Sequence, residues 1–341
     1  MSDRERKVVL GRSTRALGLA LMLAMLLPVL PGAVAAAADD GPAIAIEYPA
    51  AGRTVYVPRS SATVRWSERD DVTDRIVTEE AGPADANGDC TDAEVEQTWD
   101  DDHRSPIDVD DLQVGWCYRY RIEAELEGGD TTVERTGWLR ILTPWTGKAN
   151  LYRAGIFSTQ RRGWWCVGAS VQMMRNIVRG ESDQSFANQE NYQRDARSTD
   201  RYTSGDGARG SDPQGWVGSL RVNGAGPGYH VKELRHFRGA VRSAARSVRL
   251  TGKPVGLLVG HGSHAWVMTG FVATADPAVT DDFEVTAVYV MGSLHPRKPV
   301  SGFDPAPNTR MGMDRLKRFL TRYDDRLGPS PWDRSYVIVR P

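Results

Sequence analysis

The chain has 341 residues and a formal net charge of −1 at pH 7, and 40% of its residues are hydrophobic. This length exceeds that of a typical single domain and the apolar content is sufficient for buried cores. A chain without a folded core is therefore excluded, and two folded units are expected. We also expect no nucleic-acid partner.

Residues 1–38 have the organisation of a secretory signal peptide. Five Arg and Lys residues precede an apolar run over residues 16–30, and a tract of small residues then offers a cleavage point near Ala38. The apolar run is short for a bilayer span, which disfavours the alternative of an uncleaved membrane anchor. We therefore expect a mature protein that is secreted or held at the cell surface, with no transmembrane span.

Residues 40–146 are predicted to form an all-β unit. Short β-rich runs recur between turn residues, about seven of them in about 105 residues, which is typical of a β-sandwich. In the run over residues 117–126, tyrosine and aliphatic side chains alternate with charged ones. A period of two indicates a strand with one buried face. The acidic turns of this half lack the spacing of a calcium-binding loop, so we predict no metal there.

The sequence around this run resembles the sixth strand of fibronectin type III modules. In that family a Leu is followed six residues later by a Tyr, and then by an aliphatic residue and an Ala at steps of four and two. Leu112, Tyr118, Ile122 and Ala124 fit this spacing. The resemblance implies a module that binds or spaces other parts and carries no chemistry.

The three cysteines are divided between the two halves of the chain. Disulfides persist outside the cytosol, so export makes pairing possible, but three cysteines cannot all pair within one chain. Cys90 and Cys117 lie together in the first half and are predicted to form a disulfide. Cys166 is then an unpaired thiol in the second half.

Charge also divides the chain. Residues 39–147 contain 25 acidic and 10 basic residues, whereas residues 148–341 contain 17 acidic and 28 basic ones. One interpretation of this split is that the two halves have solvated surfaces of opposite charge. A second is that the two halves attract each other. A third interpretation is that the basic half contacts an anionic cell-surface polymer.

Residues 150–341 are predicted to be an α+β unit. Helices are expected over residues 166–179, where apolar side chains recur at steps of three and four before Gly180, over 235–253 and over 313–323. Strands are expected over 254–260, 264–273, 283–291 and 335–341. The Gly-rich residues 200–229 are predicted to be a long surface connection.

Cys166 lies where a polar stretch ends and the first predicted helix of this half begins. The free N–H groups and the dipole at a helix start stabilise a thiolate, and an imidazole nearby acts as general base. His264 is the best placed histidine, because it opens a strand after a Gly-rich turn. The Gln160 amide and the Cys166 N–H are candidate donors to an oxyanion. The alternatives left open are a buried packing role for Cys166 and a metal site at His261 and His264, which lacks an evident third ligand.

The order of Gln160, then Cys166 at a helix start, then His264 on a distant strand resembles the papain-like cysteine peptidases. The runs "WCVGASVQMM" and "HAWVMTGF" are more similar to the C39-like branch of these peptidases. The resemblance implies a papain-like fold in which these three residues are oxyanion donor, nucleophile and base, with Trp164 and Trp165 lining the substrate cleft. It also implies cleavage of peptide or amide bonds in a peptide or protein substrate, without cofactor or metal.

The chain departs from that family at the residue that orients the histidine, commonly an Asp-Pro just beyond the next strand. Here residues 292–295 follow the strand and offer no carboxylate. Ser293 is the orienter we name, with His295 or one of the acids Asp276, Asp281 and Asp282 as alternatives. Loss of an orienter costs orders of magnitude in rate. The alternative function is therefore a weakly active or inactive papain-like protein that binds cell-envelope material.

Overall fold

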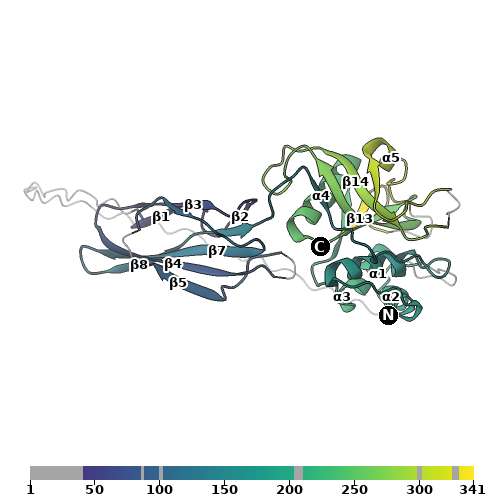
Figure 1. Cartoon of the computed structure of the whole chain (residues 1–341), viewed down its shortest axis with the longest axis horizontal. Coiled ribbons are helices and arrows are strands. Elements are labelled where there is room, and N and C mark those ends of the chain that lie inside the picture. The colour runs from purple at the N-terminus through teal and green to yellow at the C-terminus, as the bar shows by residue number, and fades with distance from the viewer. Residues whose placement is uncertain (1–40, 86–87, 100–102, 203–209, 298–301, 325–329) are drawn as a thin grey trace, which may run out of the picture. The chain divides into compact units, whose positions relative to one another are not determined.

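The described part of the chain contains three β-sheets and five α-helices (Figure 1). The computed structural model describes residues 41–341 except 86–87, 100–102, 203–209, 298–301 and 325–329. The predicted signal peptide, residues 1–38, lies outside the described residues. As predicted, a β-rich part precedes a part that combines helices with a sheet.

Two sheets are formed by residues 44–141. One has the order β1-β3-β6, from β1 (Ile44–Tyr48), β3 (Ala62–Glu68) and β6 (Ile107–Val109). The other has the order β2-β9-β7-β4-β5, with β8 also paired to β7. Its strands are β2 (Thr54–Val57), β4 (Val72–Pro83), β5 (Val95–Trp99), β7 (Trp116–Leu126), β8 (Thr131–Arg135) and β9 (Trp138–Ile141).

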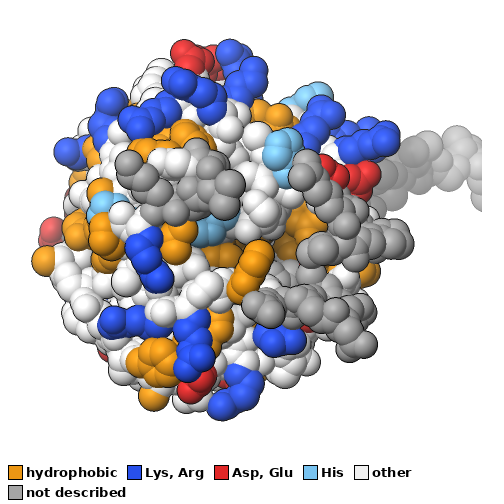
Figure 2. Space-filling view, turned by 90° about the vertical axis from the view of Figure 1, so that its right-hand side faces the viewer, with side chains coloured by type: hydrophobic (Ala, Val, Ile, Leu, Met, Phe, Trp, Pro, Cys, Tyr) orange, Lys and Arg blue, Asp and Glu red, His pale blue; other side chains and the backbone are white. Residues whose placement is uncertain are grey.

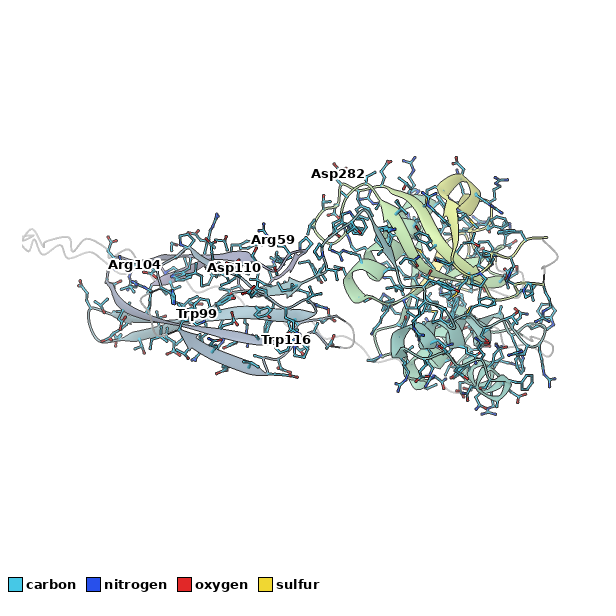
Figure 3. All side chains as sticks on the ribbon, viewed as in Figure 1. Arg59, Trp99, Arg104, Asp110, Trp116 and Asp282 are labelled. Atoms are coloured by element: carbon cyan, nitrogen blue, oxygen red, sulfur yellow. A yellow bond between two sulfur atoms is a disulfide. The ribbon has the colours of Figure 1, made fainter. Side chains whose placement is uncertain are left out.

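The two sheets share one apolar core, and strand β7 shows the alternation that builds it. Tyr118, Tyr120 and Ile122 of β7 are buried in this core, together with Trp66 of β3. The rings of Trp99 and Tyr120 are 5.6 Å apart, and Trp99 is labelled in Figure 3. The predicted period of two in this strand is confirmed.

The predicted disulfide is also confirmed. Cys117 of β7 is bonded to Cys90, and their Cα atoms are 5.7 Å apart. Cys166 is the free cysteine of the chain.

The third sheet has the order β11-β16-β12-β13-β14-β15, with β10 paired to β13, and all of its pairs are antiparallel. Its strands are β10 (Lys148–Asn150), β11 (His230–Leu234), β12 (Val255–Val259), β13 (His264–Ala273), β14 (Val285–Gly292), β15 (Thr309–Gly312) and β16 (Tyr336–Arg340). Along β13, Ala265 and Val267 join one apolar core while Trp266 and Met268 join another. The sheet is therefore covered on both faces.

Different helices contribute to these two cores. The core with Ala265 and Val267 includes side chains of α1 (Cys166–Arg179), α2 (Phe186–Ser198) and α3 (Pro213–Val222). The core with Trp266 and Met268 includes side chains of α4 (Phe237–Thr251) and α5 (Met313–Lys317). Helices α1 and α4 thus pack on opposite faces of one sheet.

The structure differs from the sequence prediction in three helices. Helix α2 was not predicted, and α3 lies inside residues 200–229, which were predicted to be a surface connection; Trp216 of α3 is fully buried. Helix α5 ends at Lys317, earlier than predicted, because the chain turns and the Phe319 carbonyl accepts the N–H of Gly260.

Candidate active site

Cys166 is the first residue of α1 and its side chain is half-buried. The preceding residue, Trp165, makes no side-chain capping bond, and the first turn contains no acidic residue. The N–H of Gly168 donates to Oε1 of Gln193 in α2 at 3.0 Å. By helix geometry the N–H groups of Cys166 and Val167 have no acceptor within α1, so the sulfur lies at an electropositive helix end.

His264 is the first residue of β13, opposite Val259 in the β12–β13 hairpin. Its side chain is 15% exposed and its ring Nε2 lies 2.9 Å from Oδ1 of Asp304. Cys166 is near enough to the same ring to raise its pKa. Because the carboxylate occupies Nε2, Nδ1 is the ring nitrogen that is left available to the sulfur. The structure thus brings Cys166 and His264 together.

The side chain of Asp304 is fully buried and accepts four hydrogen bonds. Oδ1 accepts from His264 and from the indole N–H of Trp266, the latter at 2.6 Å. Oδ2 accepts the backbone N–H groups of Leu294 and His295 at 2.6 and 2.9 Å. Buried polar groups are stable when their bonding capacity is filled, so this carboxylate is held from both sides.

A glycine makes room for this carboxylate at the end of β14. A Cβ atom on Gly292 would lie 2.2 Å from Oδ2 of Asp304, far inside van der Waals contact. The backbone N–H of Gly292 also donates to the carbonyl of Pro305 at 2.9 Å. The loop after β14 is therefore closed back onto the strand that precedes it.

The environment of His264 favours its charged form. Burial lowers the pKa of the imidazole, but the hydrogen bonds and charges of Asp304 and Cys166 outweigh that effect and raise the pKa from 6.5 to about 10. Opposite charges and hydrogen bonds to the ionised form are the ordinary causes of such a shift. With the Asp304 carboxylate on its Nε2, the imidazolium is the stable form at neutral pH.

Gln160 is buried in the segment that leads into α1. Its backbone N–H donates to the carbonyl of Ser293 at 2.7 Å, and its side-chain Nε2 donates to the carbonyl of Arg162 at 3.1 Å. That carbonyl also accepts the N–H of Trp165, so the Gln160 amide lies close to the start of α1. A primary amide has a second N–H, which remains to serve as a donor.

The sequence prediction that Ser293 orients His264 differs from the structure, in which Asp304 contacts the histidine ring. Ser293 donates its hydroxyl to the carbonyl of Ala265 at 3.0 Å, with Oε1 of Gln160 3.4 Å away, and Asp304 is the residue bonded to the ring Nε2 of His264. None of the four alternatives is hydrogen-bonded to the His264 ring, and Asp282 is exposed. Asp276 pairs with Arg249 and Asp281 with Arg246, while His295 bonds Asp304 through its backbone.

Asp304 was missed although the sequence carries a signal for it. It is followed by Pro305, the Asp-Pro pair expected beyond the strand after His264. Residues 293–303 separate this pair from the end of β14, so it does not stand at the expected place.

The two tryptophans before Cys166 differ in their surroundings. Trp164 is 61% exposed and has a φ of 69°, which is uncommon for a residue with a side chain and costs backbone strain. Trp165 is half-buried and packs on Phe186 of α2, with ring centroids 5.5 Å apart. The Arg162 guanidinium lies 5.5 Å from the Trp165 ring centre. An exposed and a half-buried indole therefore directly precede Cys166 in the chain.

Among the residues that the structure describes, no group of three His, Cys, Asp or Glu side chains is arranged to hold a metal ion. Within the same residues, no helix has both the length and the apolar character required to cross a membrane. No protein-family model, curated protein or solved structure matches the chain.

The arrangement suits nucleophilic catalysis by sulfur. A thiol beside an imidazole, which is in turn fixed by a buried carboxylate, is the geometry in which a base accepts and returns a proton. Helix N–H groups and a side-chain amide nearby supply donors for negative charge on a carbonyl oxygen.

Proposed function

We propose that this protein is an exported thiol hydrolase that cleaves peptide or amide bonds. The observation that carries the proposal is that His264 has Cys166 as a neighbour and is hydrogen-bonded through Nε2 to the buried carboxylate of Asp304. In this proposal Cys166 is the nucleophile, His264 the general acid and base, and Asp304 the residue that positions the imidazole.

The reaction has two steps. The sulfur of Cys166 attacks the carbonyl carbon, and protonated His264 gives its proton to the leaving amine as the carbon–nitrogen bond breaks. Water then attacks the resulting thioester and gives a proton to His264, and the carbon–sulfur bond breaks to release the acid and the Cys166 thiolate, which restores the starting pair. In both steps the Cys166 N–H and the free N–H of the Gln160 amide donate to the oxyanion.

The order of elements supports the finer assignment of the fold. An early helix carries the thiol, an antiparallel sheet follows, the histidine opens a strand, and an Asp-Pro pair follows the next strand. We assign residues 150–341 to the papain-like, C39-like type and residues 40–146 to the fibronectin III type of sandwich, as separate domains. Trp164 and Trp165 are assigned to the wall of the substrate cleft.

Export is supported by the Cys90–Cys117 disulfide, since such bonds persist in oxidising compartments. An anionic cell-surface polymer stays a candidate partner because Lys and Arg outnumber Asp and Glu on the face drawn in Figure 2. The alternative of a protein that only binds its ligand was based mainly on the absence of a residue that orients His264. Asp304 contacts His264, so this reason no longer favours the alternative.

The test is turnover of a peptide library by the secreted chain and three variants. We expect hydrolysis by the wild type and its loss in Cys166→Ala and His264→Ala. The matched control is His261→Asn, an exposed histidine in the same hairpin at φ 60°, a conformation that Asn tolerates. Turnover that survives Cys166→Ala, or a wild type that binds peptides and cleaves none, would overturn the proposal.

A further inference from the structure

A cavity of about 760 Å³ lies between α4 and α5, the helices that cover the sheet face opposite α1. Neither Cys166 nor His264 lines it. This volume is within the range of about 300–1,000 Å³ that is usual for sites of small organic ligands. The cavity is thus a second candidate site, separate from the thiol.

The floor of this cavity is apolar and largely aromatic. Phe283 and Val241 are buried in the core below it, and Phe237, Tyr336 and Met313 are half-buried around them. The rings of Phe237 and Tyr336 are 6.0 Å apart in an edge-to-face contact. Such a floor favours a flat or aliphatic ligand body.

The rim of the cavity is cationic. Four of its Arg and Lys side chains are exposed, and two exposed acidic side chains oppose them: Arg235, Arg238, Lys317 and Arg322 against Glu284 and Asp314. The nearest pair, Arg238 and Glu284, is 4.0 Å apart with side chains 88% and 76% exposed, so it contributes little. The rim therefore keeps an excess of positive charge.

The start of α4 adds to this charge. Its N-cap is His236, which makes no side-chain capping bond, and its first turn contains no acidic residue. Arg235 and Arg238 flank this end, although cations are unfavourable at the positive end of a helix dipole. The N–H groups of the first turn also have no acceptor within the helix. A bound anion would satisfy these N–H groups and offset the local repulsion.

We propose that this cavity binds a small amphipathic organic anion. Its phosphate, sulfate or carboxylate head contacts the first turn of α4 with Arg235 and Arg238, and its apolar body lies on Phe237 and Phe283. The site is independent of the role of Cys166, because it is built by the opposite face of the sheet.

Calorimetric titration of the full chain with octyl phosphate below its micelle concentration tests the site. We expect one equivalent to bind more tightly than inorganic phosphate, and the neutral octyl glucoside not to compete. Arg235→Gln/Arg238→Gln should weaken binding at least about tenfold, because charge-assisted hydrogen bonds are lost. Phe237→Ala should weaken octyl phosphate more than phosphate.

The matched control is Arg194→Gln/Arg197→Gln, which removes two exposed arginines from α2 and changes the net charge equally. Its affinity should equal that of the wild type. Equal losses in both double variants, or undiminished binding in Arg235→Gln/Arg238→Gln, would overturn the site. Tighter binding of hexaglutamate than of octyl phosphate would overturn the ligand class in favour of an acidic peptide.

Discussion

The Nε2 atom of His264 lies 2.9 Å from Oδ1 of Asp304, a carboxylate whose second oxygen is held by two backbone N–H groups. Because these two N–H groups hold the carboxylate in place, the carboxylate in turn orients the imidazole ring. Nδ1 is thereby left to face Cys166. Four predictions follow from this relationship and from the donors around the sulfur.

Replacing Asp304 by Asn should impair both catalysis and folding. The Asn amide turns an N–H toward one of the donors that the carboxylate now accepts, so a buried donor loses its partner. We expect turnover to fall by about 10⁴, as in a related triad. The free energy of unfolding should fall by about 1–3 kcal/mol. Denaturant titration and peptide turnover measure both, with the exposed Asp282→Asn as control (Figure 3). An Asp304→Asn protein with wild-type turnover would remove Asp304 from the mechanism.

Gly292→Ala should act on the site through Asp304. The added Cβ would lie 2.2 Å from Oδ2, so the carboxylate must move away from His264. We expect a stability loss of about 1–3 kcal/mol, typical of overpacking, together with loss of turnover. Gly312→Ala is the matched control, because a Cβ at Gly312 meets nothing within 4 Å. Equal behaviour of the two variants would contradict the close packing described for this loop.

The raised pKa of His264 predicts how stability depends on pH. The folded pKa of about 10 is above the ordinary 6.5, so the protonated ring stabilises the folded state fully below pH 6.5. This contribution is lost as pH rises toward about 10. The difference in melting temperature between the wild type and His264→Gln should therefore shrink across this range. A difference that stays constant, or grows with pH, would show that the imidazole is not held as a cation.

Gln160→Ala separates oxyanion binding from activation of the sulfur. Removing one oxyanion donor from a hydrolase costs about 10²–10³ in kcat. Alkylation of a thiol by iodoacetamide forms no oxyanion, so the rate of Cys166 alkylation should be unchanged in this variant. A parallel loss of both rates would mean that Gln160 acts by holding the segment before α1 in place.

Elements with a strong local pattern were predictable from the sequence. Helix α1 has apolar side chains at helical spacing and ends at Gly180, and β13 follows a Gly-rich turn. Helix α2 has no such apolar stripe, because it buries glutamines. Gln189 accepts the N–H of Arg161, and Gln193 accepts that of Gly168. Periodicity of apolar residues does not detect a helix that packs through its amides.

The start of α3 did carry a signal in the sequence, Asp212 before Pro213. In the structure the Asp212 side chain accepts the N–H of Gly215 at 2.7 Å and caps the helix.

The position of Asp304 in the site could not be predicted for a different reason. Its contact with His264 depends on its hydrogen bonds to the backbone of Leu294 and His295, ten and nine residues earlier in the chain, and such contacts leave no period in the sequence. The pairing of Cys166 with His264 was predictable because both stand at the ends of regular elements.

The most direct measurement is the rate of Cys166 alkylation by iodoacetamide as a function of pH, in the wild type and in His264→Ala. If the sulfur and the imidazole form an ion pair, the wild-type rate stays nearly constant from about pH 6.5 to about 9, where His264 remains protonated. In His264→Ala the rate should instead rise steeply with pH. Identical profiles that both rise with pH would contradict the proposed active site.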